Sequence, residues 1–284
     1  MLTLRLISRL LVICLLASNG YGSAQDLEGE LPHIVSQDSL RNSLRAAPLC
    51  GLEDVGTPTE TTPNDGTKFN PRQLILPGAL IAVGIFGTYD HTFKKMNVTI
   101  RDEINQFRKN NYFRVDDYIQ YLPVLTYLTF GSIGIKAKHN IRERIAIEAT
   151  AYATMAALTN IAKYSFQVKR PDASARNSFP SGHTAVAFTG AELMRMEYGL
   201  GIGIGAYALA TTVAFLRIYN GRHWLSDVIG GAGIGILSAR IGYWMLPLYR
   251  KWFKWNKAHP DVMVIAPSYS PSERNVSINL AYTF

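Results

Sequence analysis

Three short clusters of residues carry the chemistry that this sequence can support. They comprise Lys163 with Arg170, then Ser181, Gly182 and His183, and finally Arg217, His223 and Asp227. Fixed positive charges with several N–H donors suit the oxygens of a phosphoryl group. The clusters therefore predict a site for a phosphate dianion, with Lys163, Arg170 and Arg217 among the groups that bind it.

Two histidines supply the groups that hydrolysis through a covalent intermediate requires. One group must attack phosphorus and another must protonate the departing oxygen. His223 and Asp227 are four positions apart, so on a helix they share a face, and the carboxylate can hold the imidazole in one tautomer. We therefore predict that His223 is the nucleophile and that His183 is the general acid.

The second cluster has the features of a helix N-terminus. Ser181, Gly182 and His183 follow a proline and precede an apolar segment. The free N–H groups at such a position, together with a serine hydroxyl, bind anions. Ser181 and Gly182 are therefore predicted to bind the phosphate.

The spacing within and between the clusters extends this interpretation. Lys163 is followed by six residues and Arg170-Pro171, Pro180 precedes Ser181-Gly182-His183, and Arg217 is followed by five residues, His223, three residues and Asp227. In these three motifs the sequence resembles the type 2 phosphatidic acid phosphatase family, over roughly residues 72 to 250. One departure is Leu216, where the family usually has a serine.

The resemblance implies a role for each motif residue. His223 would form a phosphohistidine, Asp227 would assist it, and His183 would be the general acid. Lys163, Arg170, Ser181, Gly182 and Arg217 would hold the phosphate, and no metal or other cofactor is implied. Because Leu216 departs from the family pattern, the substrate is less determined than the reaction type.

The composition places this chemistry at a membrane. Hydrophobic residues make up 48% of the chain and charged residues only 18%. The segments 73–89, 118–135 and 199–215 contain no charged residue, while 145–162, 183–196 and 224–249 contain one or two. Segments of 17 or 18 apolar residues approach the length that crosses a hydrocarbon core. We predict an all-α fold, a transmembrane bundle of six helices, with a short C-terminal β-hairpin from the alternating pattern at 262–266 and 275–284.

Two features of the apolar segments are interpreted structurally. Glycines at 199, 201, 203 and 205, and at 230, 231, 233 and 235, would let neighbouring helices approach closely. Glu192 and Arg195 are three residues apart and are predicted to form a local ion pair outside the site.

The ends of the chain differ from its centre. Residues 1–24 resemble a signal peptide or an N-terminal apolar segment, and 25–71 are predicted to be a flexible polar segment. The phosphatase domain would cover 72–250, and a basic and aromatic flank with the hairpin would follow at 251–284. Between the first two spans, residues 90–117 mix basic and apolar positions, which indicates an interfacial helix or, alternatively, a solvated connector.

Two features of the sequence predict opposite sides of the membrane for the site. Basic residues at 136–144 and at 250–257 are typical of cytoplasmic flanks, which would leave the motifs on the external face. A cleaved export signal and three spans would instead bring Lys163 inside. We favour an inner-membrane protein of a bacterium with its site on the periplasmic side.

Together these features predict a membrane phosphatase that hydrolyses a lipid phosphomonoester or pyrophosphate through a phosphohistidine, without metal. Its partners would be the bilayer and the substrate, which would be a lipid A phosphate, undecaprenyl pyrophosphate, phosphatidic acid or phosphatidylglycerol phosphate. The net charge of +8 lies at span boundaries and motif positions, so it does not indicate nucleic-acid binding, and no protein partner is inferred. The alternatives are a soluble-type periplasmic acid phosphatase, a vanadium haloperoxidase of the same fold, and a non-catalytic protein that binds anionic lipid.

Overall fold

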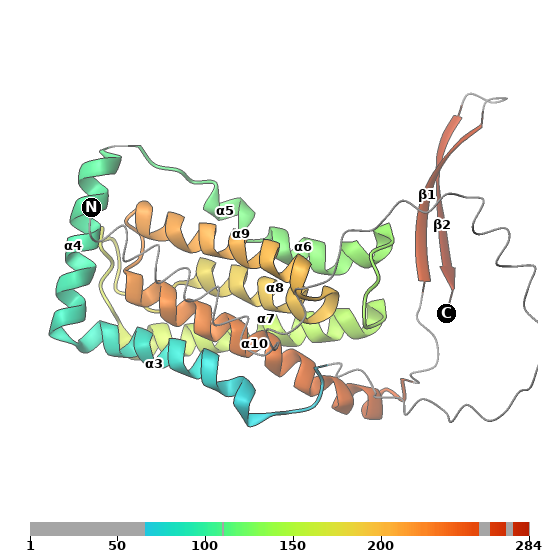
Figure 1. Cartoon of the computed structure of the whole chain (residues 1–284), viewed down its shortest axis with the longest axis horizontal. Coiled ribbons are helices and arrows are strands. Elements are labelled where there is room, and N and C mark those ends of the chain that lie inside the picture. The colour runs from blue at the N-terminus through green and yellow to red at the C-terminus, as the bar shows by residue number, and fades with distance from the viewer. Residues whose placement is uncertain (1–65, 110, 256–261, 271–274, 284) are drawn as a thin grey trace, which may run out of the picture.

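The computed structural model describes residues 66–109, 111–255, 262–270 and 275–283. Its long helices lie side by side along one axis, and α4 stands across one end of the bundle (Figure 1). The helical elements are η1 (Pro71–Leu74), α3 (Ile75–Tyr89), α4 (His91–Arg108), α5 (Asp116–Ile119), α6 (Leu122–Thr129), η2 (Phe130–Ile133), α7 (Ile141–Phe166), α8 (Gly182–Tyr198), α9 (Leu200–Tyr219) and α10 (Leu225–Trp252). The predicted signal segment 1–24 and nearly all of the polar segment 25–71 lie outside the described residues.

Helix α10 lies at the centre of the bundle and packs against α3, α7 and α8. Its glycines make this packing possible, because a Cβ at Gly231 would lie 2.6 Å from the Ser181 carbonyl oxygen, and one at Gly235 would lie 2.6 Å from that of Ala185. The prediction of close helix approach is thus confirmed for the second glycine run. For the first run it is wrong at 199, 201 and 205, where an added Cβ would meet no atom within 4 Å.

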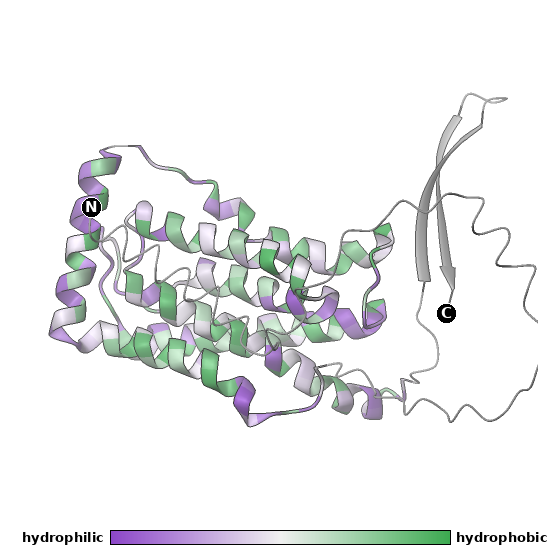
Figure 2. Cartoon of the chain, viewed as in Figure 1, coloured by the Kyte–Doolittle hydropathy of each residue, from purple (hydrophilic) through white to green (hydrophobic). Residues whose placement is uncertain are grey.

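Three helical segments are long and apolar enough to cross a membrane, judged by length and composition: Pro71–Tyr89, Leu200–Tyr219 and Leu225–Trp252. Figure 2 shows α3 as mainly hydrophobic, whereas α4 is largely hydrophilic. Helices α7 and α8 cover the ranges expected at 145–162 and 183–196, but they are more polar than these three segments. The count of six spans remains a prediction.

The segment expected as a continuous span at 118–135 is broken. It contains the second half of α5, the eight-residue α6 and η2, which is followed by Gly134 with a φ of 90°. The segment still joins both ends of the bundle, because Asp116 bonds Arg217 near the end of α9 while the Gly131 N–H bonds the Tyr198 hydroxyl at the end of α8. No described helix of spanning length covers it.

The segment 90–117 contains α4, whose N-cap Asp90 accepts a hydrogen bond from the Phe93 N–H. Ile100 and Ile104 are buried in a cluster with residues of α9 and α10. Phe107, in the last turn of α4, is 82% exposed. This helix is therefore fastened to the bundle on one face, and its contact with a membrane stays a prediction.

The C-terminal strands are β1 (Val262–Ser270) and β2 (Asn275–Thr283). They pair antiparallel, with Val262 opposite Thr283 and Ser270 opposite Asn275. The first strand is longer than the predicted 262–266, and the residues that would form the turn lie outside the described residues.

Two groups of charged residues lie within the bundle. Glu192 forms the predicted ion pair with Arg195, at 2.6 Å, and also binds Arg240 and the Tyr207 hydroxyl. Arg144, which the sequence assigned to a basic membrane flank, is buried and donates to the Tyr127 and Leu128 carbonyls. Arg144 therefore has a structural role, and it cannot be counted among the basic residues that indicate a cytoplasmic flank.

Candidate active site

The structure brings the three motifs together at one end of the bundle. Lys163 lies in the last turn of α7, and Arg217 in the last turn of α9. His183 is in the first turn of α8, and Asp227 in the first turn of α10. Because neighbouring helices run in opposite directions, two helix ends and two helix starts meet here (Figure 1).

His223 is held by the backbone of the loop before α8. Its Nδ1 lies 2.8 Å from the Ser178 carbonyl oxygen, and the residue is 3% exposed. A carbonyl oxygen only accepts, so Nδ1 carries the hydrogen and the lone pair resides on Nε2. This is the tautomer that a nucleophilic histidine requires.

Burial also keeps the His223 imidazole neutral. It lowers the pKa of His223 from 6.5 to about 4, mainly because the charged form loses hydration. Arg217 and Lys163 lower the pKa further, while Asp227 raises it. The ring is therefore unprotonated near neutral pH, and its Nε2 lone pair is available.

Asp227 supports His223 in a different way from the one predicted. The two residues do not share a helical face, because α10 begins only at Leu225. The Asp227 Oδ2 instead accepts hydrogen bonds from the Trp224 N–H at 2.9 Å and from the Ser178 hydroxyl at 2.5 Å. It lies 3.6 Å from His223 Nδ1, where its charge favours an imidazolium.

Asn177 connects two of the predicted phosphate ligands. The Lys163 ammonium donates to the Asn177 backbone oxygen at 2.8 Å, and Arg170 Nε donates to its side-chain oxygen at 2.9 Å. The Lys163 charge is also within electrostatic range of Arg217 and Asp227. The loop that positions His223 thus positions two cations as well.

The start of α8 provides the predicted anion site. Ser181 is its N-cap, and no side chain caps the helix, so the first N–H groups remain for a ligand. Thr184 donates to the Ser181 hydroxyl oxygen at 2.9 Å, which leaves the serine hydrogen available. A Cβ at Gly182 would meet no atom within 4 Å, so the space beside this residue is open.

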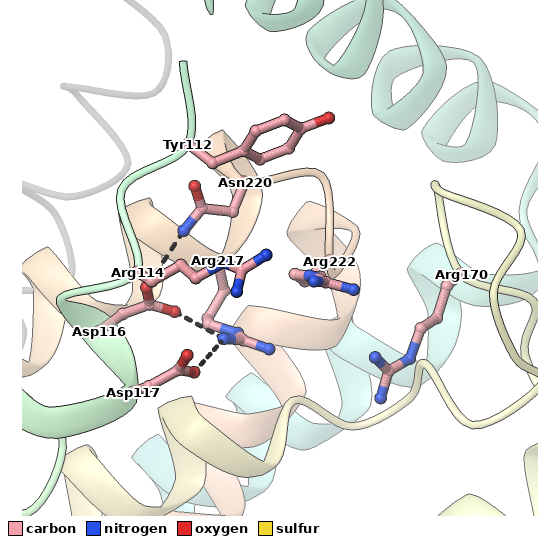
Figure 3. Close-up of a pocket in the computed structure, with 8 residues that line it drawn as sticks. All are labelled: Tyr112, Arg114, Asp116, Asp117, Arg170, Arg217, Asn220 and Arg222. Carbon is pink, nitrogen blue, oxygen red and sulfur yellow. Dashed lines mark hydrogen bonds and ion pairs between the residues drawn. The ribbon is translucent and has the colours of Figure 1, made fainter. Parts of the chain in front are cut away.

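The two remaining predicted site residues, His183 and Arg217, both contact aspartate side chains. Asp117 lies 2.9 Å from His183 Nε2 and 3.2 Å from Arg217 Nη1, and Asp116 accepts from the same Arg217 nitrogen at 2.6 Å. Figure 3 shows both carboxylates directed at the Arg217 guanidinium. A phosphate bound by Arg217 and His183 must therefore share these groups with Asp117 or displace it.

The same aspartates and His183 are the described residues that come nearest to a metal site. Their ligand atoms lie within 4.8 Å of one another. The Arg217 guanidinium binds both carboxylates and supplies positive charge at this place. Across the whole cavity, four guanidinium groups face these two carboxylates, so the charge balance suits an anion better than a cation.

Sequence reasoning missed four polar residues of this site: Asn177, Ser178, Asp116 and Asp117. Asn177 and Ser178 immediately precede the second motif, and this adjacency was the available signal. Asp116 and Asp117 lie 101 and 100 positions from Arg217, so no local pattern connects them to it.

An open cavity lies in front of these residues. It is lined by Arg114, Arg170, Arg217 and Arg222, and by Asp116 and Asp117, among others. Figure 3 shows Arg114 reaching in from the connection before α5, with Arg222 and Arg170 on the other side. The guanidinium groups of Arg170 and Arg217, two of the predicted phosphate ligands, can bind a phosphate in this cavity by charge-assisted hydrogen bonds.

Comparison with known proteins identifies the part of the chain that contains these motifs. Residues 145–251 match the profile of the PAP2 superfamily. A lipid A 1-phosphatase from Porphyromonas gingivalis is 38% identical over 139 residues, which are 48% of this chain and 31% of that protein. YbjG of Escherichia coli, whose name as an undecaprenyl-diphosphatase is provisional, is 39% identical over 29% of this chain and 44% of its own length.

Each match thus spans less than half of these relatives. Among solved structures, the first transmembrane PAP2-type phosphatidylglycerolphosphate phosphatase from Bacillus subtilis is similar, with a TM-score of 0.46 and 19% identity. That alignment covers 65% of this chain and 99% of the other.

Proposed function

We propose that this chain, a member of the type 2 phosphatidic acid phosphatase (PAP2) superfamily, is a membrane phosphatase that hydrolyses a phosphate ester or pyrophosphate of a lipid. The observation that carries the proposal is the state of His223. It is buried and neutral, with its Nδ1 hydrogen held by the Ser178 carbonyl, and it lies within electrostatic range of Lys163 and Arg217. A free Nε2 lone pair beside fixed cations suits attack on a bound phosphate.

In the first step, Nε2 of His223 attacks phosphorus and the bond from phosphorus to the lipid oxygen breaks. His183 donates a proton to that departing oxygen, which leaves as the alcohol or the shorter phosphate. Asp227 stabilises the positive charge that develops on His223. Lys163, Arg170 and Arg217 would bind the non-bridging oxygens, together with Ser181 and Gly182 at the start of α8.

In the second step, water attacks the phosphohistidine and the bond between phosphorus and nitrogen breaks. His183, now unprotonated, accepts a proton from that water and returns to its initial state. Inorganic phosphate leaves, and His223 recovers the neutral tautomer. No step in this scheme requires a metal ion.

The lipid nature of the substrate is supported by the three helical segments with the length and composition of membrane spans. The named relatives act on lipid A and, provisionally, on undecaprenyl diphosphate, so both classes head the candidates for this chain. Phosphatidic acid and phosphatidylglycerol phosphate remain in the panel. We propose an inner-membrane location with the site facing the periplasm.

The course of α3 bears on that orientation. A Cβ at Gly87, near its end, would lie 2.9 Å from the Ser226 side chain at the active-site end. Gln73, just before its start, accepts from Trp244 toward the other end. If α3 crosses the membrane and the site is external, residue 70 lies on the inner side, which can be checked by labelling single cysteines introduced at 70 and 91.

The direct test measures phosphate release from a panel of lipid phosphates by the detergent-solubilised full chain, with a chelator present throughout. Wild type is expected to release phosphate, and His223→Ala is expected to release none above background. Release that persists in His223→Ala, or that stops when the chelator is added, would contradict the mechanism. Absence of release from every lipid would contradict the function.

A further inference from the structure

A second cavity adjoins the one that holds the phosphate motifs. The two cavities share four lining residues, among them Arg114 and Arg222. Arg101, Arg108 and Asp172 also line the second cavity. None of these residues belongs to the three motifs.

The arginines of the second cavity differ in how many contacts their side chains make with the rest of the protein. Arg108 is 7% exposed, donates to the Tyr219 carbonyl and to Asn105, and lies over the Tyr112 ring at 4.2 Å. Arg101 is paired with Asp102 at 2.8 Å. Arg108 is therefore held by the fold, whereas Arg101 is engaged by its exposed neighbour Asp102 and lies over the Trp224 ring at 5.5 Å.

Arg114 and Arg222 are not fixed in this way. The Arg114 side chain is exposed and makes no hydrogen bond or ion pair within the described part of the chain. Arg222 has one ion pair, a 3.2 Å contact with Asp172, and its side chain is 40% exposed. Both guanidinium groups line the boundary between the cavities, so they retain donors for a ligand.

The lining of the two cavities together carries enough positive charge for more than one anion. Six arginines line them against three aspartates, and two of those aspartates are already bound to Arg217. A single phosphate held by Arg170 and Arg217 would leave Arg114 and Arg222 without a counter-charge beyond Asp172. Guanidinium groups placed this way match the geometry of a second phosphoryl group.

We infer that Arg114 and Arg222 bind a second phosphate of the substrate, so that the enzyme prefers lipids with two phosphates to lipids with one. This inference rests on the proposed function, because the first phosphate is the one that His223 attacks. The second phosphate is either the neighbouring group of a diphosphate or a separate ester on the same lipid. Both present anionic phosphoryl oxygens to the arginines, with one negative charge on the inner group of a diphosphate and up to two on a separate phosphate ester.

The test compares matched substrates that differ in one phosphate. One pair is a prenyl monophosphate and the corresponding diphosphate, and the other is a lipid-substituted glucosamine disaccharide with one or two phosphates. The values of kcat/KM are measured for wild type, Arg114→Gln, Arg222→Gln and the control Arg176→Gln. Arg176 is exposed and lines neither cavity.

The Arg114→Gln and Arg222→Gln variants are expected to lose about tenfold in kcat/KM on the doubly phosphorylated member of a pair, the loss expected for one exposed charge-assisted contact. On the singly phosphorylated member the change is expected to stay below about twofold, and Arg176→Gln is expected to behave as wild type. A selective loss confined to one pair supports the inference and identifies whether the second phosphate is adjacent or remote.

Equal losses on both members of each pair, or no loss on either, would overturn the inference while leaving the proposed function intact. Failure of wild type to hydrolyse any monophosphate or diphosphate would instead overturn the proposed function, and the inference with it. Unfolding temperatures of the two variants close to that of wild type are expected, because Arg114 and Arg222 make few contacts.

Discussion

The two ends of the bundle each hold a buried histidine beside a buried carboxylate, and they differ in what surrounds that pair. At the active-site end, His223 Nδ1 lies 3.6 Å from Asp227, and at the other end His139 Nδ1 lies 2.8 Å from Glu197. The side chains of all four residues are at most 2% exposed. The type and burial of the pair are therefore shared.

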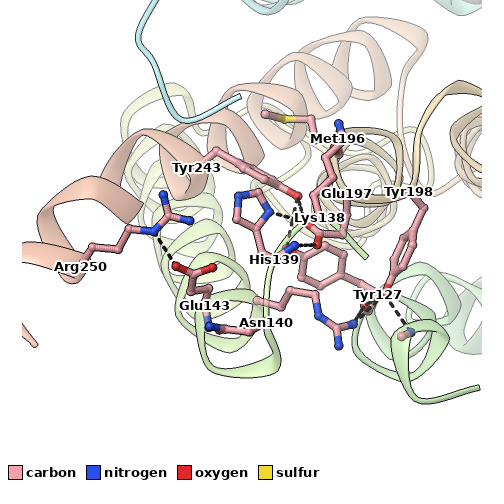
Figure 4. A network of polar contacts seen from close by, with 12 residues as sticks. Tyr127, Lys138, His139, Asn140, Glu143, Met196, Glu197, Tyr198, Tyr243 and Arg250 are labelled. Carbon is pink, nitrogen blue, oxygen red and sulfur yellow. Dashed lines mark hydrogen bonds and ion pairs between the residues drawn. The ribbon is translucent and has the colours of Figure 1, made fainter. Parts of the chain in front are cut away.

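At the far end, the Glu197 carboxylate is bound by donors from the fold itself (Figure 4). Glu197 accepts from the His139 N–H, from His139 Nδ1 and from the Tyr243 hydroxyl. These donors come from the segment before α7 and from α10, while Glu197 is in α8. The carboxylate thereby connects three elements, which is a structural role.

The pair at the active-site end has a tighter link to the backbone and a looser one to its carboxylate. Fixed cations surround it, since Lys163 and Arg217 both act on His223. An open cavity with four arginines lies beside it. The comparison teaches that a buried histidine–carboxylate pair becomes a candidate for chemistry through the cations and the cavity beside it.

The largest expected difference between the two ends is in turnover. His223→Ala removes the proposed nucleophile, so kcat should fall by about 10⁴-fold or more. His139→Ala should keep kcat within about threefold and lower the unfolding temperature instead, because the buried Glu197 carboxylate loses one of its hydrogen-bond donors. Phosphate release and thermal unfolding of both variants check this, and similar losses of kcat would break the comparison.

Asp227→Asn is expected to have the next largest effect. It removes the charge that stabilises an imidazolium, while the Ser178 carbonyl still holds Nδ1, so kcat should fall about 10²-fold with little change in KM. The matched variant Glu197→Gln should change kcat by less than about twofold. A loss for Asp227→Asn that appears mainly in KM would contradict the assigned role.

The pH dependence should reveal the depressed pKa of His223, which is about 4. The neutral, reactive form of His223 predominates above that value, so the acid limb of kcat/KM should appear only below about pH 4, with a fall of about tenfold per pH unit. Loss of the proton that His183 must donate gives a separate fall at higher pH. The substrate's own ionisation is determined separately and corrected for. An acid limb attributable to the enzyme near pH 6.5 would show that His223 is not depressed in this way.

The same pKa shift has a consequence for stability. The unfolded chain takes up a proton on His223 below about pH 6.5, while the folded chain does so only below about 4. The free energy of unfolding should therefore decrease as the pH falls between these values, and the contribution is fully present above 6.5. Thermal unfolding of wild type and His223→Ala across this range checks it, because the variant lacks this contribution.

Ser178→Ala is expected to have the smallest effect on turnover. It removes one of the two hydrogen bonds to Asp227 but leaves the backbone carbonyl that orients His223. A decrease in kcat of about three- to tenfold is expected, equivalent to one hydrogen bond. A loss as large as that of Asp227→Asn would show that the hydroxyl, and not the carbonyl, positions the pair.

The motifs were predictable because their parts lie close together in the chain. The start of α8 at Gly182 follows from a local signal, and so does the ion pair of Glu192 with Arg195. The broken span at 118–135 was missed because an uncharged run does not reveal that it divides into α5, α6 and η2. The structural use of Arg144 was missed because charge alone does not show burial.

The residue types and spacings by themselves carried the resemblance to the PAP2 superfamily, the choice of His223 as candidate nucleophile and the set of cations for a phosphate. Only the tertiary structure decided that the Ser178 carbonyl selects the His223 tautomer, that Asp116 and Asp117 bind Arg217, and that Arg114 adjoins the site. The physical reason is distance along the chain. Motifs whose residues lie within a few positions of one another can be recognised in the sequence. Contacts between residues 45 or 101 positions apart form only once the helices have packed.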